Sequence, residues 1–159
     1  PAQDIDNVSV SSTKIRTALK EGRLKTANNY LGYNYMLNGT IVNGKKLGGK
    51  IGFPTANLDI KEPYKLIPKT GVYVIKTIID AVLYTGMMNI GFNPTVKGKY
   101  QTIEAHLFDF NKDLYGRKVT IELLFFLREE QKFNSIEDLI IQLNLDKVNA
   151  LFYLTNNPA

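Results

Sequence analysis

Runs of β-branched and aromatic residues follow one another along the chain from about residue 35. Clusters of Gly, Pro, Asn or Asp separate these runs, and no helical pattern lies between them, which favours an antiparallel barrel or sandwich. The dipeptide Asp80-Ala81 stands between two of the runs and predicts a tight hairpin there. The predicted strands are Tyr35–Val42, Val72–Ile79, Val82–Ile90, Thr102–Phe110 and Val119–Leu127.

Near the N-terminus, hydrophobic residues recur at helical spacing instead. Ser11 or Ser12 can cap a first helix, and Gly22 ends it. A second short helix is predicted at about Leu24–Leu31, ending at Gly32. The apolar positions of the two helices are Ile15, Ala18, Leu19, Leu24, Ala27 and Leu31.

The same spacing predicts a helical segment at the C-terminus. Ser135 and Asp138 resemble a capping box, which satisfies backbone N–H groups at a helix start. Asp146 is predicted to cap a further turn, and residues 155–159 are predicted to form a frayed tail. The hydrophobic positions are Leu139, Ile140 and Leu143 in the first part, and Val148, Leu151 and Phe152 in the second.

Composition narrows the class of protein. A chain of 159 residues with 44% hydrophobic content suits one domain with a substantial core. No apolar run approaches the roughly 18 residues that a membrane span needs, and the N-terminus lacks a signal-peptide pattern. The absence of cysteine excludes disulfides and thiolate metal sites, and one histidine disfavours a zinc cluster. We therefore expect a cytoplasmic protein without a membrane partner.

The net charge of +5 indicates a basic surface. The segment from Lys14 to Lys25 has five basic residues and one acidic residue, Glu21, and the other charges are scattered along the chain. A nucleic-acid-binding protein more often shows a concentrated basic stripe with interleaved aromatic residues. We expect no nucleic-acid partner, although a basic barrel that binds nucleic acid remains an alternative.

The segment Gly44–Asn57, GKKLGGKIGFPTAN, has the composition of a phosphate-binding loop. Its four glycines allow backbone N–H groups to approach an anion. Thr55 and Asn57 offer hard oxygen atoms of the kind that Mg²⁺ accepts, and Pro54 stiffens the backbone before them. The loop is neither a P-loop nor a G-x-G-x-x-G motif. It predicts a nucleotide–magnesium site; ordinary turn chemistry is the alternative. Its lysines are Lys45, Lys46 and Lys50.

Alternation along Thr102–Phe110 separates two sets of side chains. One set is uniformly apolar and predicts core, whereas the other carries a carboxylate and the only histidine. Glu104 is therefore either a solvated strand residue or a candidate general base, and His106 is either a hydrogen-bonded strand residue or a ligand contact. The apolar set is Ile103, Ala105 and Leu107, and the other is Glu104, His106 and Phe108.

Six motifs follow one another along the chain: GFPTAN, GVY, NIGFNPT, IEAHLFDF, DLYG and FLREEQKF. In this order they resemble riboflavin kinase, and more closely the kinase half of the bacterial bifunctional riboflavin kinase/FMN adenylyltransferase. The resemblance covers roughly residues 33–150. It implies a mainly β fold, a six-stranded antiparallel Greek-key barrel with a C-terminal helix and a short N-terminal helical segment. It also implies Mg²⁺-dependent transfer of the γ-phosphate of ATP to the 5′-hydroxyl of riboflavin, giving FMN.

The resemblance assigns roles residue by residue. Glu104 matches the catalytic glutamate, and Thr55 and Asn57 match the magnesium ligands. The implied nucleotide contacts are Gly44, Lys50, Thr55, Asn57, His106 and Tyr115, and the implied flavin contacts are Arg128, Gln131 and Phe133. Two of these have ordinary alternatives: Tyr115 as an aromatic residue at the barrel rim, and Arg128 as a surface charge. A non-catalytic FMN-binding barrel is the alternative function.

Residues 1–32 differ from residues 33–159, which we expect to form the kinase domain. The run VSSTKIR, Val10–Arg16, resembles the last motif of the family's adenylyltransferase module. The H-x-G-H type motif that accompanies it in that module is missing from this sequence. We therefore expect residues 1–32 to be a helical remnant or linker, adenylyltransferase activity to be missing, and the full-length protein to carry that module upstream.

Overall fold

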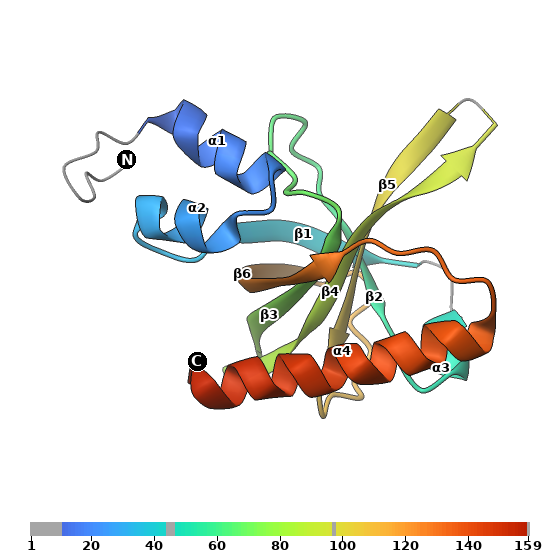
Figure 1. Cartoon of the computed structure of the whole chain (residues 1–159). Coiled ribbons are helices and arrows are strands. Elements are labelled where there is room, and N and C mark those ends of the chain that lie inside the picture. The colour runs from blue at the N-terminus through green and yellow to red at the C-terminus, as the bar shows by residue number, and fades with distance from the viewer. Residues whose placement is uncertain (1–10, 44–46, 97, 159) are drawn as a thin grey trace.

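The computed structural model describes residues 11–43, 47–96 and 98–158. Within these ranges six antiparallel strands form a closed barrel in the order β1-β2-β5-β4-β3-β6 (Figure 1). Strands β2 and β3 are consecutive in sequence but not neighbours in the barrel, and the same holds for β5 and β6. The segments that connect these two pairs therefore cross the barrel. The predicted six-stranded barrel is confirmed. Its strands are β1 Met36–Val42, β2 Ala56–Asp59, β3 Gly71–Ile79, β4 Val82–Thr95, β5 Gly98–Leu107 and β6 Lys118–Glu129.

The pattern of hydrophobic residues located five strands and missed β2. That strand has four residues with a single buried position, Leu58, so it shows no alternation. The β4–β5 pair also extends to Thr95 and Gly98, beyond the predicted ends at Ile90 and Thr102. This added part projects from the barrel and therefore has no buried face to mark it in the sequence (Figure 1).

The predicted hairpin between β3 and β4 is confirmed. Asp80 and Ala81 connect the paired residues Ile79 and Val82, and their φ angles are 51° and 65°. Positive φ at both positions is the geometry of a type I′ turn, which matches the twist of the two strands. The guanidinium of Arg117 donates to both carboxylate oxygens of Asp80, at 3.1 and 2.8 Å.

Adjacent residues of β3 belong to two different hydrophobic clusters. Tyr73 and Ile75 lie in the barrel interior, whereas Val72 and Val74 lie on its outer face. All four are buried: the interior pair by the barrel itself, and the outer pair because the helix α4, Ile136–Asn156, covers the outer face (Figure 1). The outer cluster consists of Phe53, Val72, Val74, Met87, Phe108 and Ala150.

The two predicted N-terminal helices are confirmed as α1, Ser12–Lys20, and α2, Leu24–Leu31. Their buried residues join the interior cluster of the barrel. Asn28 fixes α2 further, because its side chain donates to the Leu123 carbonyl at 3.1 Å and accepts from the Tyr35 amide at 2.9 Å. The origin of these helices in an adenylyltransferase module stays a prediction.

The C-terminal helix begins as predicted and continues further than predicted. Ser135 caps it by accepting from the Asp138 amide at 3.1 Å. The predicted new cap at Asp146 is wrong, because α4 runs unbroken through this residue to Asn156. Asp146 is instead 1% exposed and ion-paired with Arg128. The predicted tail is shorter for the same reason, since residues 155 and 156 are still helical.

Candidate active site

A row of paired residues crosses five neighbouring strands on the outer face of the barrel. Asn57 pairs with Glu104, Glu104 with Asn89, Asn89 with Val72, and Val72 with Arg128. Directly opposed residues project to the same side of a sheet. Because neighbouring strands lie about 4.8 Å apart, the four steps of the row measure about 19 Å along the curved surface of the barrel. The polar row therefore places the candidate magnesium ligand at one end and the candidate flavin contact at the other.

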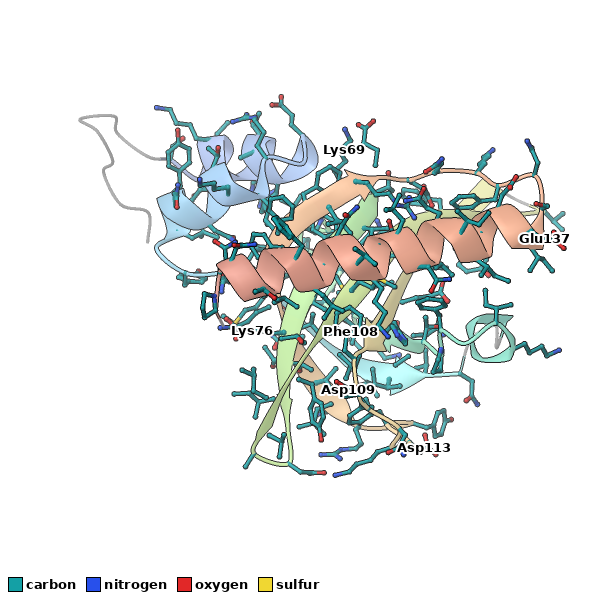
Figure 2. The ribbon with its side chains drawn as sticks, turned by 60° about the horizontal axis from the view of Figure 1, so that its bottom comes forward. Lys69, Lys76, Phe108, Asp109, Asp113 and Glu137 are labelled. Atoms are coloured by element: carbon teal, nitrogen blue, oxygen red, sulfur yellow. The ribbon has the colours of Figure 1, made fainter. Side chains whose placement is uncertain are left out.

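A second row lies beside it and is mostly apolar. It contains Phe125, Val74, Met87 and His106 on four neighbouring strands. Phe108 comes directly after the end of β5 and packs under α4, where Lys147 lies 5.9 Å from its ring centroid (Figure 2). The predicted alternation along β5 is thus correct: Ile103, Ala105 and Leu107 are in the interior, and Glu104 and His106 are outside.

Two cavities share one lining residue, Thr55. The second reaches the barrel interior, because Ala105 and Leu107 are part of its lining. The first, of about 310 Å³, lies against α4 and has Leu139 and Leu143 of that helix in its lining. The second, of about 660 Å³, lies beside the loop that contains Asp113, which Figure 2 shows beyond Phe108 and away from α4. The lining of the first cavity also includes Asn89, Glu104, His106, Arg128, Gln131 and Phe133. The lining of the second includes Asn43, Pro54, Asn57, Lys112, Asp113 and Tyr115.

Thr55 and Glu104 meet where the two cavities join. The Thr55 hydroxyl donates to Glu104 Oε1 at 3.2 Å. Thr55 directly precedes β2, and Glu104 is fixed on β5 by its pairing with Asn57. A carboxylate in this position can contact a group that enters from the first cavity while remaining beside a group held in the second.

His106 holds the segment that carries Thr55. Its Nδ1 lies 2.7 Å from the Pro54 carbonyl, and because a carbonyl only accepts, the ring donates from this nitrogen. Phe53 and Phe108 flank the ring, with centroids at 5.3 and 5.8 Å. His106 lines the first cavity and not the one that contains Tyr115. Its assignment to nucleotide binding stays a prediction.

The three candidate flavin contacts lie together. Arg128, Gln131 and Phe133 all line the first cavity, and the Arg128 guanidinium carbon lies 5.9 Å from the Phe133 ring centroid. Arg128 is not a surface charge, since its side chain is 19% exposed and pairs with Asp146. Its neighbour Glu129 is exposed and hydrogen-bonded to Lys69, which lowers the pKa of the Glu129 carboxyl below its ordinary value.

The remaining candidates are less closely associated with the cavities. Tyr115 lines the second cavity and is mostly exposed. Lys50 ends the short helix α3, Leu47–Lys50, where it is exposed and lines neither cavity. Gly44 lies outside the described residues, as do Lys45 and Lys46. The structure therefore gathers Thr55, Asn57 and Tyr115 around the second cavity and leaves Lys50 apart.

Sequence reasoning missed four polar residues that line the first cavity: Asn89, Asn93, Glu130 and Asp146. Asn89 could have been found from the sequence, because it lies two positions after Met87 and therefore on the same face of β4. A polar residue at such a position indicates a face that is not purely hydrophobic core. Glu130 carried none. Its carboxylate packs on Gly91, where an added Cβ would lie 2.3 Å from Glu130 Oε1.

The donor atoms at the junction are suited to a hard cation. Thr55, Asn57 and Glu104 supply hydroxyl, amide and carboxylate oxygens, the ligand types that Mg²⁺ takes together with phosphate oxygens. In the part of the chain that the structure describes, no three His, Cys, Asp or Glu side chains gather closely enough to hold a metal ion alone. The set therefore fits a cation that arrives with a phosphate ligand.

Comparison with known proteins gives this barrel a family. The flavokinase family model, described as riboflavin kinase, matches residues 31–154. The chain therefore belongs to the riboflavin kinase family. It is 42% identical over 150 residues to the bifunctional riboflavin kinase/FMN adenylyltransferase of Bacillus subtilis, covering 92% of this chain and 47% of that protein. The corresponding Listeria monocytogenes enzyme is 45% identical over 139 residues, covering 87% and 44%. The chain thus spans about half the length of these relatives.

Two solved structures resemble the fold. A crystal structure described as a macrolide-efflux protein from Streptococcus pneumoniae superposes with a TM-score of 0.85 and 34% identity, over 100% of this chain and 50% of that one. Riboflavin kinase from Trypanosoma brucei superposes with a TM-score of 0.52 and 25% identity, over 77% and 80%. Among the described residues, no helix is both long and apolar enough to cross a membrane.

Proposed function

We propose that this chain phosphorylates riboflavin at its 5′-hydroxyl with ATP, giving FMN and ADP. The observation that carries the proposal is the contact between Thr55 and Glu104, 3.2 Å apart, where two cavities share a wall. Phosphoryl transfer between two substrates requires two binding sites that meet at the reacting atoms. Membership of the riboflavin kinase family supplies the identity of the two substrates.

The first cavity suits the flavin. Arg128 and Phe133 offer a planar cation and an aromatic face to the isoalloxazine ring. From there the polar row passes Asn89 and reaches Glu104, so a ribityl chain laid along it brings its 5′-hydroxyl to the carboxylate. The second cavity, with Asn57, Lys112 and Tyr115, then receives the nucleotide.

Glu104 acts as the general base. The ribityl oxygen attacks the γ-phosphorus, the bond from that phosphorus to the β,γ-bridging oxygen breaks, and ADP leaves with the electron pair. The hydroxyl proton passes to the Glu104 carboxylate. The Thr55 hydroxyl holds Oε1 in place for this step. Such a base contributes about 10²–10⁴-fold to a rate.

Thr55 and Asn57 would hold Mg²⁺ through their side-chain oxygens. When bound, the ion neutralises phosphate charge. His106 contributes indirectly, because its hydrogen bond to the Pro54 carbonyl fixes the backbone from which Thr55 projects.

The relatives point to a longer protein. Both are named as bifunctional, and this chain covers less than half of each. We propose that the full-length protein carries an FMN adenylyltransferase module upstream and works in the cytoplasm.

The direct test is incubation of the purified chain with riboflavin, ATP and Mg²⁺, followed by chromatography for FMN. Catalytic turnover that EDTA abolishes is the expected result. A non-catalytic FMN-binding barrel would instead bind FMN tightly and form none from riboflavin. A salt-dependent gel shift with RNA or DNA, without FMN formation, would favour a nucleic-acid-binding barrel.

A further inference from the structure

Asp146 is a charged residue on the face of α4 that packs on the barrel. It is 1% exposed, and Ala150, one turn further on, belongs to the hydrophobic cluster beneath the helix. A buried ion pair is often no more stabilising than apolar residues of similar volume. Packing of the helix alone therefore does not account for a carboxylate at this position.

Three hydrogen bonds hold this carboxylate. Arg128 donates from Nε to Oδ1 and from Nη2 to Oδ2, both at 2.8 Å, in a bidentate pair. Gln142, one turn earlier on α4, donates to Oδ1 at 2.8 Å. The pair joins the end of the polar row on β6 to the middle of the covering helix, and both partners line the first cavity.

The contacts of Arg128 determine how it can meet a ligand. Two of its five N–H groups point to Asp146, and Nη1 donates to the Glu129 carbonyl at 3.0 Å. Asp146 therefore occupies one of the two forked edges of the guanidinium, the edge formed by Nε and Nη2. The planar face and two N–H groups remain for a molecule in the cavity, where Phe133 also lies.

We propose that Asp146 is a positioning residue for the flavin. By occupying the Nε–Nη2 edge of Arg128, it fixes the plane of the guanidinium so that its face meets the isoalloxazine ring, and it links this contact to the packing of α4 on the barrel. The inference rests on the proposed function, since it takes riboflavin to be the molecule in the first cavity. A role limited to anchoring α4 is the competing explanation.

The test compares Asp146→Asn with wild type by two binding measurements without turnover. Riboflavin affinity is followed by flavin fluorescence, and ADP–Mg²⁺ affinity by calorimetry. The riboflavin dissociation constant is expected to rise about tenfold, while that of ADP stays the same. In an Arg128→Gln background, Asp146→Asn should cause no further loss of riboflavin affinity, because its effect passes through Arg128.

Asp80→Asn is the matched control, since Asp80 makes a bidentate pair with Arg117 and neither residue lines the first cavity; it should leave the riboflavin affinity unchanged. An Asp146→Asn protein with a lowered melting temperature and wild-type riboflavin affinity would overturn the inference. A full additional loss in the Arg128→Gln background would also overturn it.

If Asp146→Asn does not fold, Gln142→Leu removes one hydrogen bond from the carboxylate and leaves the charge pair intact. A rise of about threefold in the riboflavin dissociation constant is then expected, and no change refutes the inference. The proposed function fails separately, if the wild-type chain forms no FMN.

Discussion

The two cavities of this barrel differ in how they are enclosed. The first lies under α4, beside the hydrophobic cluster of the outer face, and its arginine is held by a buried carboxylate. The second lies beside the Asp113 loop, with the exposed Tyr115 in its lining. An apolar wall suits a planar ring, and the polar groups of Asn57, Lys112 and Tyr115 in the second cavity suit a nucleotide that enters with its cation. On this assignment, a substitution in either cavity should weaken binding of one substrate, and a substitution at the junction should lower turnover.

The largest effect is expected at the junction. Glu104→Gln keeps the shape of the side chain and removes the base, so kcat should fall by about 10²–10⁴-fold while both KM values change little. Steady-state FMN formation, with each substrate varied in turn, measures this. Turnover at the wild-type rate would remove Glu104 from the mechanism.

A smaller and one-sided effect is expected in the first cavity. Phe133→Ala deletes an aromatic wall, so KM for riboflavin should rise about tenfold and KM for ATP should not change. The same assay gives both values. A rise confined to ATP would reverse the assignment of the two cavities.

The reciprocal substitution in the second cavity is Tyr115→Ala. Because the Tyr115 side chain is 61% exposed, it can cover only part of a ligand, and KM for ATP should rise by about threefold. KM for riboflavin should be unaffected. An unchanged KM for ATP would leave Tyr115 as an ordinary aromatic residue at the rim.

The smallest effect is expected at Asp80, which lines neither cavity. Hydrogen bonds and charge from Arg117 lower the pKa of Asp80 below its ordinary value. A lowered carboxyl pKa stabilises the fold above the ordinary Asp pKa of about 3.9 and ceases to do so as the pH falls through the lowered value. Asp80→Asn should therefore lower the melting temperature slightly at neutral pH, with wild type and variant converging in strong acid. Kinetic constants should be unchanged, and a change in either KM would show that the comparison of cavities is incomplete.

Local patterns in the sequence were sufficient for most of the barrel. Alternation separated Ile103, Ala105 and Leu107 from Glu104 and His106, and turn chemistry located Asp80-Ala81. Strand β2 was not predicted, because four residues with one buried position form no alternating pattern. The extension of β4 and β5 was not predicted, because it covers no core.

The candidate site was only partly accessible from the sequence. Motifs indicated Thr55, Asn57 and Glu104, and the structure places Asn57 and Thr55 against Glu104. The partners of His106 and Arg128 lie 52 and 18 positions away, and only the closed barrel and the seated helix bring them together. Asp146 was interpreted as a helix cap because a polar residue in an apolar helical pattern gives no sign of a buried partner.

The position of α4 at the end of the chain has a consequence for biogenesis. Chains leave the ribosome from the N-terminus, so every strand and the interior of the barrel are synthesised before this helix emerges. Glu104 on β5 is therefore synthesised while the helix that walls the first cavity is still being translated. The barrel can close first, and the first cavity gains its helical wall only when residues 136–156 have been released and have docked.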